Sequence, residues 1–170
     1  VEVPASWANP EADAPKAERT GRPEVVKLVN DLLDPIAKMD GDSLPVSAFT
    51  DCVDGQFVTG ASAYEKRGTA VMVPEWDETK CIQCNRCSYV CPHATIRPFA
   101  LTEEEVAAAP EGLQVAKMTG KGLEALKFTM AVSPMDCMGC GVCVGECPAK
   151  EKAIKMVPRE SQEYKQPVFD

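Results

Sequence analysis

The sequence lacks an excess of basic residues, long apolar runs and any abundance of aromatic side chains. Its 170 residues include 18 Lys and Arg against 26 Asp and Glu, which gives a net charge of −8, and only 6% are aromatic. Nucleic acids and anionic membranes attract basic surfaces, so neither is expected as a partner. No apolar run reaches the roughly 20 residues that a membrane-spanning helix needs.

A secretory signal is also missing. The first residues, VEVPASWANPEADAPKAERT, have neither the basic region nor the apolar region of such a signal, and they do not begin with Met. We therefore expect a cytoplasmic location and a chain that has been cut from something longer.

Cysteine, in contrast, is abundant. Eight of the nine cysteines fall into two tight clusters at short, repeated intervals, whereas Cys52 stands alone in its loop. Disulfides between such close neighbours would be strained, and a reducing compartment disfavours them. The clustered thiols are therefore interpreted as metal ligands, and Cys52 as a small buried side chain.

The two clusters share one spacing, C-x2-C-x2-C-x3-C followed by proline. The first run is CIQCNRCSYVCP, from Cys81, and the second is CMGCGVCVGECP, from Cys137. This is the pattern of bacterial iron–sulfur proteins, so two [4Fe-4S] clusters are expected. Loops with two residues between thiols can curl around a cubane and aim backbone N–H groups at its sulfides. Zinc is the alternative, although structural zinc ribbons use paired C-x2-C knuckles.

The spacing leaves open whether each run encloses one cluster alone or gives its fourth thiol to the other cluster. In two-cluster ferredoxins the fourth cysteine ligates the other cluster. Applied here, that pattern predicts Cys81, Cys84, Cys87 and Cys147 for the first cluster, and Cys137, Cys140, Cys143 and Cys91 for the second. Ligands exchanged in this way would hold both clusters in one small fold, which suits electron transfer between them.

The segments around the two runs predict an internal duplication. TAVMVPEW and IRPFAL flank the first run as strands, and LKFTMAVSP and AIKMVP flank the second. Thr102 and Glu105 form a capping-box signal for a short helix that ends before Pro110. The fold class expected is α+β: a ferredoxin-like dicluster domain with pseudo-twofold duplication, preceded by an irregular, loop-rich segment with one helix.

The expected order of domains follows from composition. Residues 1–23 are predicted to be an extended arm, 24–72 the loop-rich segment, 73–158 the dicluster domain with an insertion at about 98–125, and 159–170 a polar tail that wraps outward. In the loop-rich segment, PEVVKLVNDLLDPIAKM predicts a helix that begins at Pro23 and stops at Pro35. Residues 40–60 are expected to be loop with at most short extended pieces.

Several motifs of this chain resemble the pyruvate:ferredoxin (flavodoxin) oxidoreductase family, in which an "EKR" segment precedes a two-cluster domain. The most specific are YEKRG at 64–68 and CPHATIRP at 91–98. The others are LPVSAF at 44–49, DG at 54–55, VPEW at 73–76, LKF at 126–128 and DCMGCGVCVGECPAKEKA at 136–153. The resemblance covers roughly residues 20–158.

The resemblance implies a module that conducts electrons and is not itself catalytic. In the family, a CoA-acylating enzyme decarboxylates pyruvate on thiamine diphosphate and passes electrons through three [4Fe-4S] clusters to ferredoxin or flavodoxin. No thiamine diphosphate motif is present here, so that cofactor, Mg2+ and the third cluster are expected in remaining domains of a homodimeric enzyme. The alternatives are a free-standing ferredoxin-like carrier, a cluster subunit of another redox complex, or a zinc-dependent interaction module.

Overall fold

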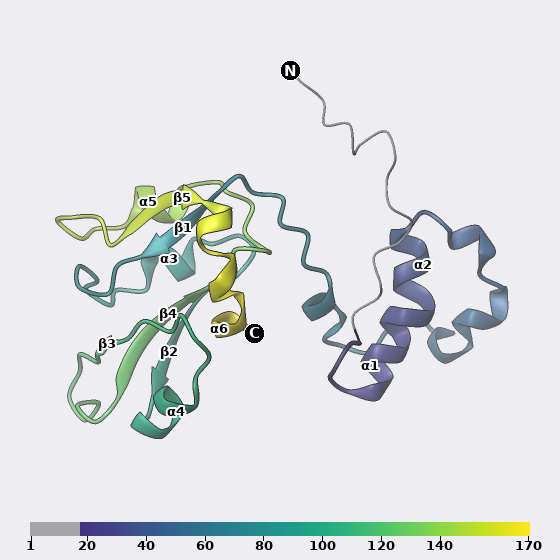
Figure 1. Cartoon of the computed structure of the whole chain (residues 1–170), viewed down its shortest axis with the longest axis horizontal. Helices are drawn as coiled ribbons and strands as arrows, with labels where there is room; N and C mark the ends of the chain where they lie inside the picture. Colours follow the sequence, from purple (N-terminus) through teal and green to yellow (C-terminus); the bar gives the residue numbers. More distant parts are fainter. Residues whose placement is uncertain (1–17) are drawn as a thin grey trace, which may run out of the picture. The chain divides into compact units, whose positions relative to one another are not determined.

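The computed structural model describes residues 18–170, so most of the expected arm at 1–23 lies outside the described residues. The chain divides into two compact units, with the division between Tyr64 and Glu65 (Figure 1). Within the described residues, no helix combines the length and the apolar character needed to cross a bilayer.

The first unit is built on one helical rod. It comprises α1 (Pro23–Leu28), a π-helical turn (Val29–Leu33) and α2 (Asp34–Ala37). The predicted start at Pro23 is confirmed, but the predicted stop at Pro35 is wrong. Proline breaks a helix through its missing N–H and the clash of its ring with the preceding turn. Here Pro35 lies in the first turn of α2, directly after the π-helical turn. That turn is wider than an α-helical turn, so it accommodates the proline ring and the missing N–H.

The rest of the first unit is a series of tight turns. The structure has 3-10 helices at Gly41–Ser43, Val46–Cys52 and Ala61–Tyr64, where the sequence predicted loop with at most short extended pieces over 40–60. Hydroxyl side chains favour these turns by local hydrogen bonds, since Ser43 Oγ donates to the Asp40 carbonyl at 2.7 Å. The core of this unit is formed by Val25, Val29 and Leu32, each 3% exposed.

The second unit contains two small antiparallel sheets. One pairs β1 (Met72–Trp76) with β5 (Ile154–Pro158), and the other orders β2 (Ile96–Leu101), β4 (Lys127–Val132) and the short β3 (Ala116–Lys117) as β2-β4-β3 (Figure 1). The four strands predicted beside the cysteine runs are confirmed, and so is a mixture of helices with small sheets. Each sheet joins a strand that flanks the first run to a strand that flanks the second, which brings the two runs together.

Three short helices accompany the sheets. Each cysteine run contains one, α3 (Arg86–Tyr89) in the first and α5 (Val142–Glu146) in the second. The third, α4 (Glu103–Ala108), begins at the predicted capping box. There the Glu105 amide donates to Thr102 Oγ1 at 3.2 Å, and the Thr102 amide donates to Glu105 Oε2 at 2.7 Å.

The end of the chain folds back instead of wrapping outward, so that expectation is wrong. It forms turns at Arg159–Ser161 and Glu163–Lys165 and the helix α6 (Gln166–Phe169). Gln166 Oε1 accepts hydrogen bonds from Ser133 Oγ at 3.0 Å and from the Met135 amide at 3.1 Å. The polar side chains that suggested a solvated tail thus satisfy backbone and side-chain groups that β4 leaves unpaired at its end.

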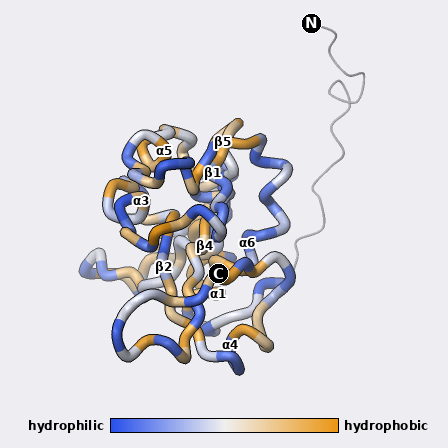
Figure 2. Tube along the Cα trace, turned by 90° about the vertical axis from the view of Figure 1, so that its left-hand side faces the viewer, coloured by the Kyte–Doolittle hydropathy of each residue, from blue (hydrophilic) through white to orange (hydrophobic). Residues whose placement is uncertain are grey.

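The core of the second unit is shared between apolar side chains and thiols. Trp76 and Phe128 pack edge to face, with ring centroids 6.0 Å apart. The buried members of this core are Trp76, Ile96, Phe128, Met130, Cys143 and Ile154, and Cys81, Cys87 and Cys91 pack against them. Figure 2 shows hydrophobic and hydrophilic stretches interspersed along the chain. The cysteine runs are therefore part of the core and not loops attached to it.

Candidate metal centres

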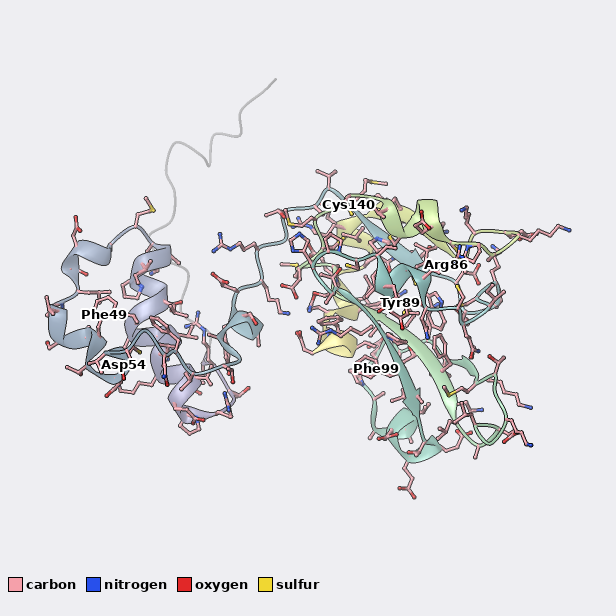
Figure 3. The ribbon with its side chains drawn as sticks, turned by 180° about the vertical axis from the view of Figure 1, so that it is seen from behind. Phe49, Asp54, Arg86, Tyr89, Phe99 and Cys140 are labelled. Atoms are coloured by element: carbon pink, nitrogen blue, oxygen red, sulfur yellow. The ribbon has the colours of Figure 1, made fainter. Side chains whose placement is uncertain are left out.

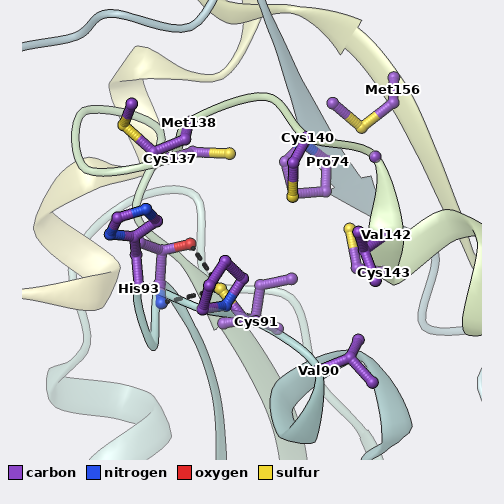
Figure 4. A pocket seen from close by; sticks show the side chains of 14 residues that line it. Pro74, Val90, Cys91, His93, Cys137, Met138, Cys140, Val142, Cys143 and Met156 are labelled. Carbon is purple, nitrogen blue, oxygen red and sulfur yellow. Dashed lines mark hydrogen bonds between the residues drawn. The ribbon is translucent and has the colours of Figure 1, made fainter.

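The structure brings the cysteines together in two groups of four. One pocket is lined by Cys81, Cys84 and Cys87 together with Cys147. A second pocket is lined by Cys137, Cys140 and Cys143 together with Cys91 (Figure 4). Each pocket thus has three thiols of one run and the last thiol of the other. The assignment of these thiols as cluster ligands stays a prediction.

The surroundings of the two pockets are mainly apolar. The first also has Trp76, Ile82 and Ile154 in its wall, and the second has Pro74 and Val90. Within the described residues, no group of His, Cys, Asp or Glu side chains closes around one point as it would for a single ion. The thiols are instead spread over the pocket walls.

Both runs reach this arrangement through the same backbone conformation at matching positions. Gln83 and Asn85 have φ values of 57° and 59°, and Gly139 and Gly141 have 71° and 73°. These left-handed residues curl each loop so that a backbone amide faces a thiol. The Gln83 amide donates to Cys81 Sγ at 3.4 Å, and the Gly139 amide donates to Cys137 Sγ at 3.3 Å. Such donors stabilise negative charge on sulfur.

The Cys91 sulfur has the most hydrogen-bond donors. The Thr95 hydroxyl and the Thr95 amide each lie 3.3 Å from it. Dashed lines mark the hydrogen bonds at Cys91 in Figure 4. Burial raises the pKa of the Cys91 thiol, but hydrogen bonds from Thr95 and from the His93 and Ile96 amides lower it more, so that its pKa falls below the usual value. These hydrogen bonds therefore favour the thiolate form of Cys91 relative to an unperturbed cysteine.

The thiols of Cys87 and Cys143 behave in the opposite way. Burial, together with a smaller effect of neighbouring thiols, raises the pKa of Cys87 to about 12 and that of Cys143 to about 11. A thiolate at these positions needs a positive partner in the pocket, because an uncompensated buried charge is costly. Four thiols around an apolar pocket with inward amide donors match the ligand chemistry of an iron–sulfur cluster.

Exposure differs within each group. Cys84 and Cys140 are exposed, whereas Cys137 and Cys143 are 8% and 7% exposed. Figure 3 shows Cys140 at the edge of the second unit, and Arg86 and Tyr89 on α3. Each pocket thus has one thiol close to solvent. Cys52 lies in the first unit and is half-buried, so it belongs to neither group.

Some residues near the pockets could not be identified from the spacing of the cysteines. Thr95 lies within the CPHATIRP motif, but only its place four residues after Cys91 could have suggested a hydrogen bond to that thiol. Lys66 pairs with Asp136, which directly precedes Cys137, across a sequence separation of 70 residues. Only the folded chain reveals that contact.

Comparisons with known proteins cover both parts of the chain. Residues 11–70 match EKR, a domain of unknown function, and residues 80–151 match a 4Fe-4S dicluster domain. The pyruvate:ferredoxin oxidoreductase of Moorella thermoacetica is 49% identical over 160 residues, which are 94% of this chain and 13% of that protein. The pyruvate-flavodoxin oxidoreductase of Klebsiella pneumoniae is 44% identical over 170 residues, 100% of this chain and 14% of that protein.

A relative with a different name is similar over almost the same region. The mitochondrial pyruvate dehydrogenase [NADP(+)] of Euglena gracilis is 44% identical over 156 residues, 92% of this chain and 8% of that protein. This chain therefore spans a small part of the length of the curated relatives that it matches. Over that part, the chain has an EKR domain followed by a 4Fe-4S dicluster domain and is similar to pyruvate:ferredoxin and pyruvate-flavodoxin oxidoreductases.

Proposed function

We propose that this chain is the electron-transfer module of a CoA-acylating pyruvate:ferredoxin oxidoreductase. It would carry electrons from the oxidative decarboxylation of pyruvate through two [4Fe-4S] clusters to ferredoxin or flavodoxin. The observation that carries the proposal is the grouping of thiols: each pocket is lined by three cysteines of one run and the last cysteine of the other. The match to a 4Fe-4S dicluster domain supports it.

The ligands proposed for the first cluster are Cys81, Cys84, Cys87 and Cys147, and those for the second are Cys137, Cys140, Cys143 and Cys91. When bound, these clusters supply one-electron redox chemistry. The protein holds the thiols in a shared core, excludes water with apolar walls and directs amide and hydroxyl donors at sulfur. The pairing of β1 with β5 and of β2 with β4, with matching left-handed positions in both runs, supports the pseudo-twofold duplication.

The rest of the reaction belongs to other parts of the proposed enzyme. Thiamine diphosphate, Mg2+ and a third [4Fe-4S] cluster are expected in those parts, since relatives are several times longer than this chain. The proposed partners are the remaining domains, a second copy of the enzyme, and ferredoxin or flavodoxin as the acceptor. The proposed location is the cytoplasm. The proposed domain boundaries stay at 24–72 for the EKR-type segment and 73–158 for the dicluster domain.

A Cys91→Ala variant of the full-length protein tests the ligand assignment. Alanine offers no ligand, so the variant is expected to lose the cluster of Cys137 to Cys143 and to keep that of Cys81 to Cys87. Iron content should fall by about one cluster, or about four iron atoms. Peptide-resolved hydrogen exchange should show loosening over residues 135–144 that exceeds any over 79–90. Cys52→Ala is the matched control and should keep all of its iron.

Two outcomes would count against the proposal. Loosening confined to residues 79–90 in Cys91→Ala would show that each run binds its own cluster. Wild-type protein that contains zinc and no iron would rule out electron transfer altogether.

A further inference from the structure

Residues 66–73, which include the end of the YEKRG motif, run beside the second cysteine loop. The Gly68 amide donates to the Met135 carbonyl at 2.8 Å, and Thr69 Oγ1 donates to Met138 Sδ at 3.5 Å. Further along, Ala70 and Val73 form a buried cluster with Cys137. This segment therefore contacts the second loop before, at and after the first cysteine of the run.

Lys66 makes the charged contact of this segment. Its Nζ lies 2.7 Å from Asp136 Oδ2 and 3.0 Å from Asp170 Oδ1. The side chains of Lys66 and Asp136 are 21% and 28% exposed, so water screens their pair less than it screens a surface pair. Asp136 is also fixed by Ser133, whose Oγ donates to Asp136 Oδ2 at 2.7 Å.

The two cysteine runs differ in the charge of the residue directly before their first cysteine. The residue directly before the first cysteine is Lys80 in the first run and Asp136 in the second. Lys80 pairs with Asp77 at 2.9 Å, so the first run carries its own cation there. The second run carries a carboxylate instead, and Lys66 is the cation placed against it.

We propose that Lys66 is a positioning residue for the second cysteine loop: it anchors Asp136 and offsets its negative charge beside the pocket of Cys137, Cys140, Cys143 and Cys91. This inference rests on the proposed function, because the charge matters only if a cluster is reduced there. A nearby cation favours the reduced, more negative cluster, and an uncompensated carboxylate opposes it. The inference gives the EKR segment a definite role, which is to complete the electrostatic surroundings of one cluster.

Arg67 provides a matched comparison within the same motif. It pairs with its neighbour Glu65 at 2.8 Å, and the two side chains are 71% and 58% exposed. Replacing Arg67 removes the same charge one residue away but leaves the second loop untouched.

The test compares Lys66→Gln, Lys66→Arg and Arg67→Gln in the full-length protein by redox titration followed by EPR. Lys66→Gln is expected to shift the midpoint of one cluster to a more negative potential and to leave the others in place. Lys66→Arg should restore the wild-type value, and Arg67→Gln should keep it. Asp136→Asn should shift the same midpoint in the positive direction, because it removes the carboxylate itself.

Hydrogen exchange locates the effect independently of the potentials. Lys66→Gln should speed exchange over residues 133–143 and not over 79–90. Loss of iron in Lys66→Gln that is confined to the second run and rescued by arginine would also support the inference. Equal behaviour of Lys66→Gln and Arg67→Gln, or equal changes in both runs, would overturn it. Wild-type protein without iron–sulfur clusters would instead overturn the proposed function, so the two failures are distinguishable.

Discussion

At the scale of single residues, Gly139 and Gly141 share a conformation but differ in what surrounds them. Their φ values are 71° and 73°. A Cβ on Gly139 would lie 2.9 Å from the Met72 carbonyl oxygen and 3.2 Å from the Ala70 Cβ, whereas a Cβ on Gly141 would meet nothing within 4 Å. Only Gly139 therefore reports on the contact between residues 70–72 and the second loop.

We predict that Gly139→Ala destabilises the protein more than Gly141→Ala. Both variants should lose about 1 kcal/mol from the left-handed backbone. Gly139→Ala should lose about 1–3 kcal/mol more, because backbone atoms must move to admit the methyl group. Urea unfolding at matched iron content measures the difference. Equal losses would mean that residues 70–72 do not constrain the loop.

The repeated cysteine spacing made the thiols of the candidate site predictable from the sequence. The two thiol runs are visible because each is local and the pattern occurs twice. The partners of the thiols are not visible in this way. Thr95 bonds to the Cys91 sulfur across a turn, and no spacing rule specifies the geometry of that turn. Lys66 contacts Asp136 only after the chain has folded.

At the scale of elements, Gln83 connects the first cysteine loop to the β3 hairpin. Its Nε2 donates to the Lys117 carbonyl at 2.8 Å, and its Oε1 accepts from the Thr119 amide at 2.9 Å and the Thr119 hydroxyl at 3.0 Å. Since β3 pairs only with β4, this side chain is a link between the insertion and the first pocket.

We predict that Gln83→Ala frees the hairpin from the loop. Neutral hydrogen bonds contribute about 0.5–1.5 kcal/mol each, so the loss of these three should cost about 1.5–4.5 kcal/mol in local stability. Hydrogen exchange over residues 116–126 should become faster. Lys117→Ala is the control, because Gln83 binds the backbone carbonyl of Lys117 and not its side chain. A hairpin that loosens equally in both variants would contradict the prediction.

The elements show where sequence patterns succeed and where they fail. β1, β2, β4 and β5 were predictable, because their apolar and β-branched residues adjoin the cysteine runs. The helix around Pro35 and the folded end of the chain were not. In each case another feature overrides what the local residues favour. A π-helical turn allows the helix to continue past Pro35, and hydrogen bonds of Gln166 to Ser133 and Met135 hold the polar end of the chain against the second unit.

At the scale of the whole molecule, the two units differ in whether cysteines contribute to their cores. The thiols Cys81, Cys87, Cys91 and Cys143 contribute to the core of the second unit, whereas the core of the first consists of Val25, Val29 and Leu32. Metal removal should therefore affect one unit and spare the other.

We predict that removing iron with a chelator under reducing conditions loosens the second unit selectively. Exchange should become faster over 72–76 and 154–158, because protonated thiols no longer hold the loops around these strands. Residues 23–37 should keep their protection. Mass-resolved hydrogen exchange before and after chelation measures this. A uniform change along the chain, or none in the second unit, would be inconsistent with a shared core of thiols and apolar side chains.

The pairing of β1 with β5 also has a consequence for biosynthesis. A ribosome makes Met72–Trp76 long before Ile154–Pro158, so the earlier strand emerges without its neighbour. During that interval the first thiols are open to oxidants and to stray metals. In the proposed ligand assignment, neither cluster has all four of its thiols until the second run has been synthesised, and translation that stops before that run leaves the first thiols without their partners.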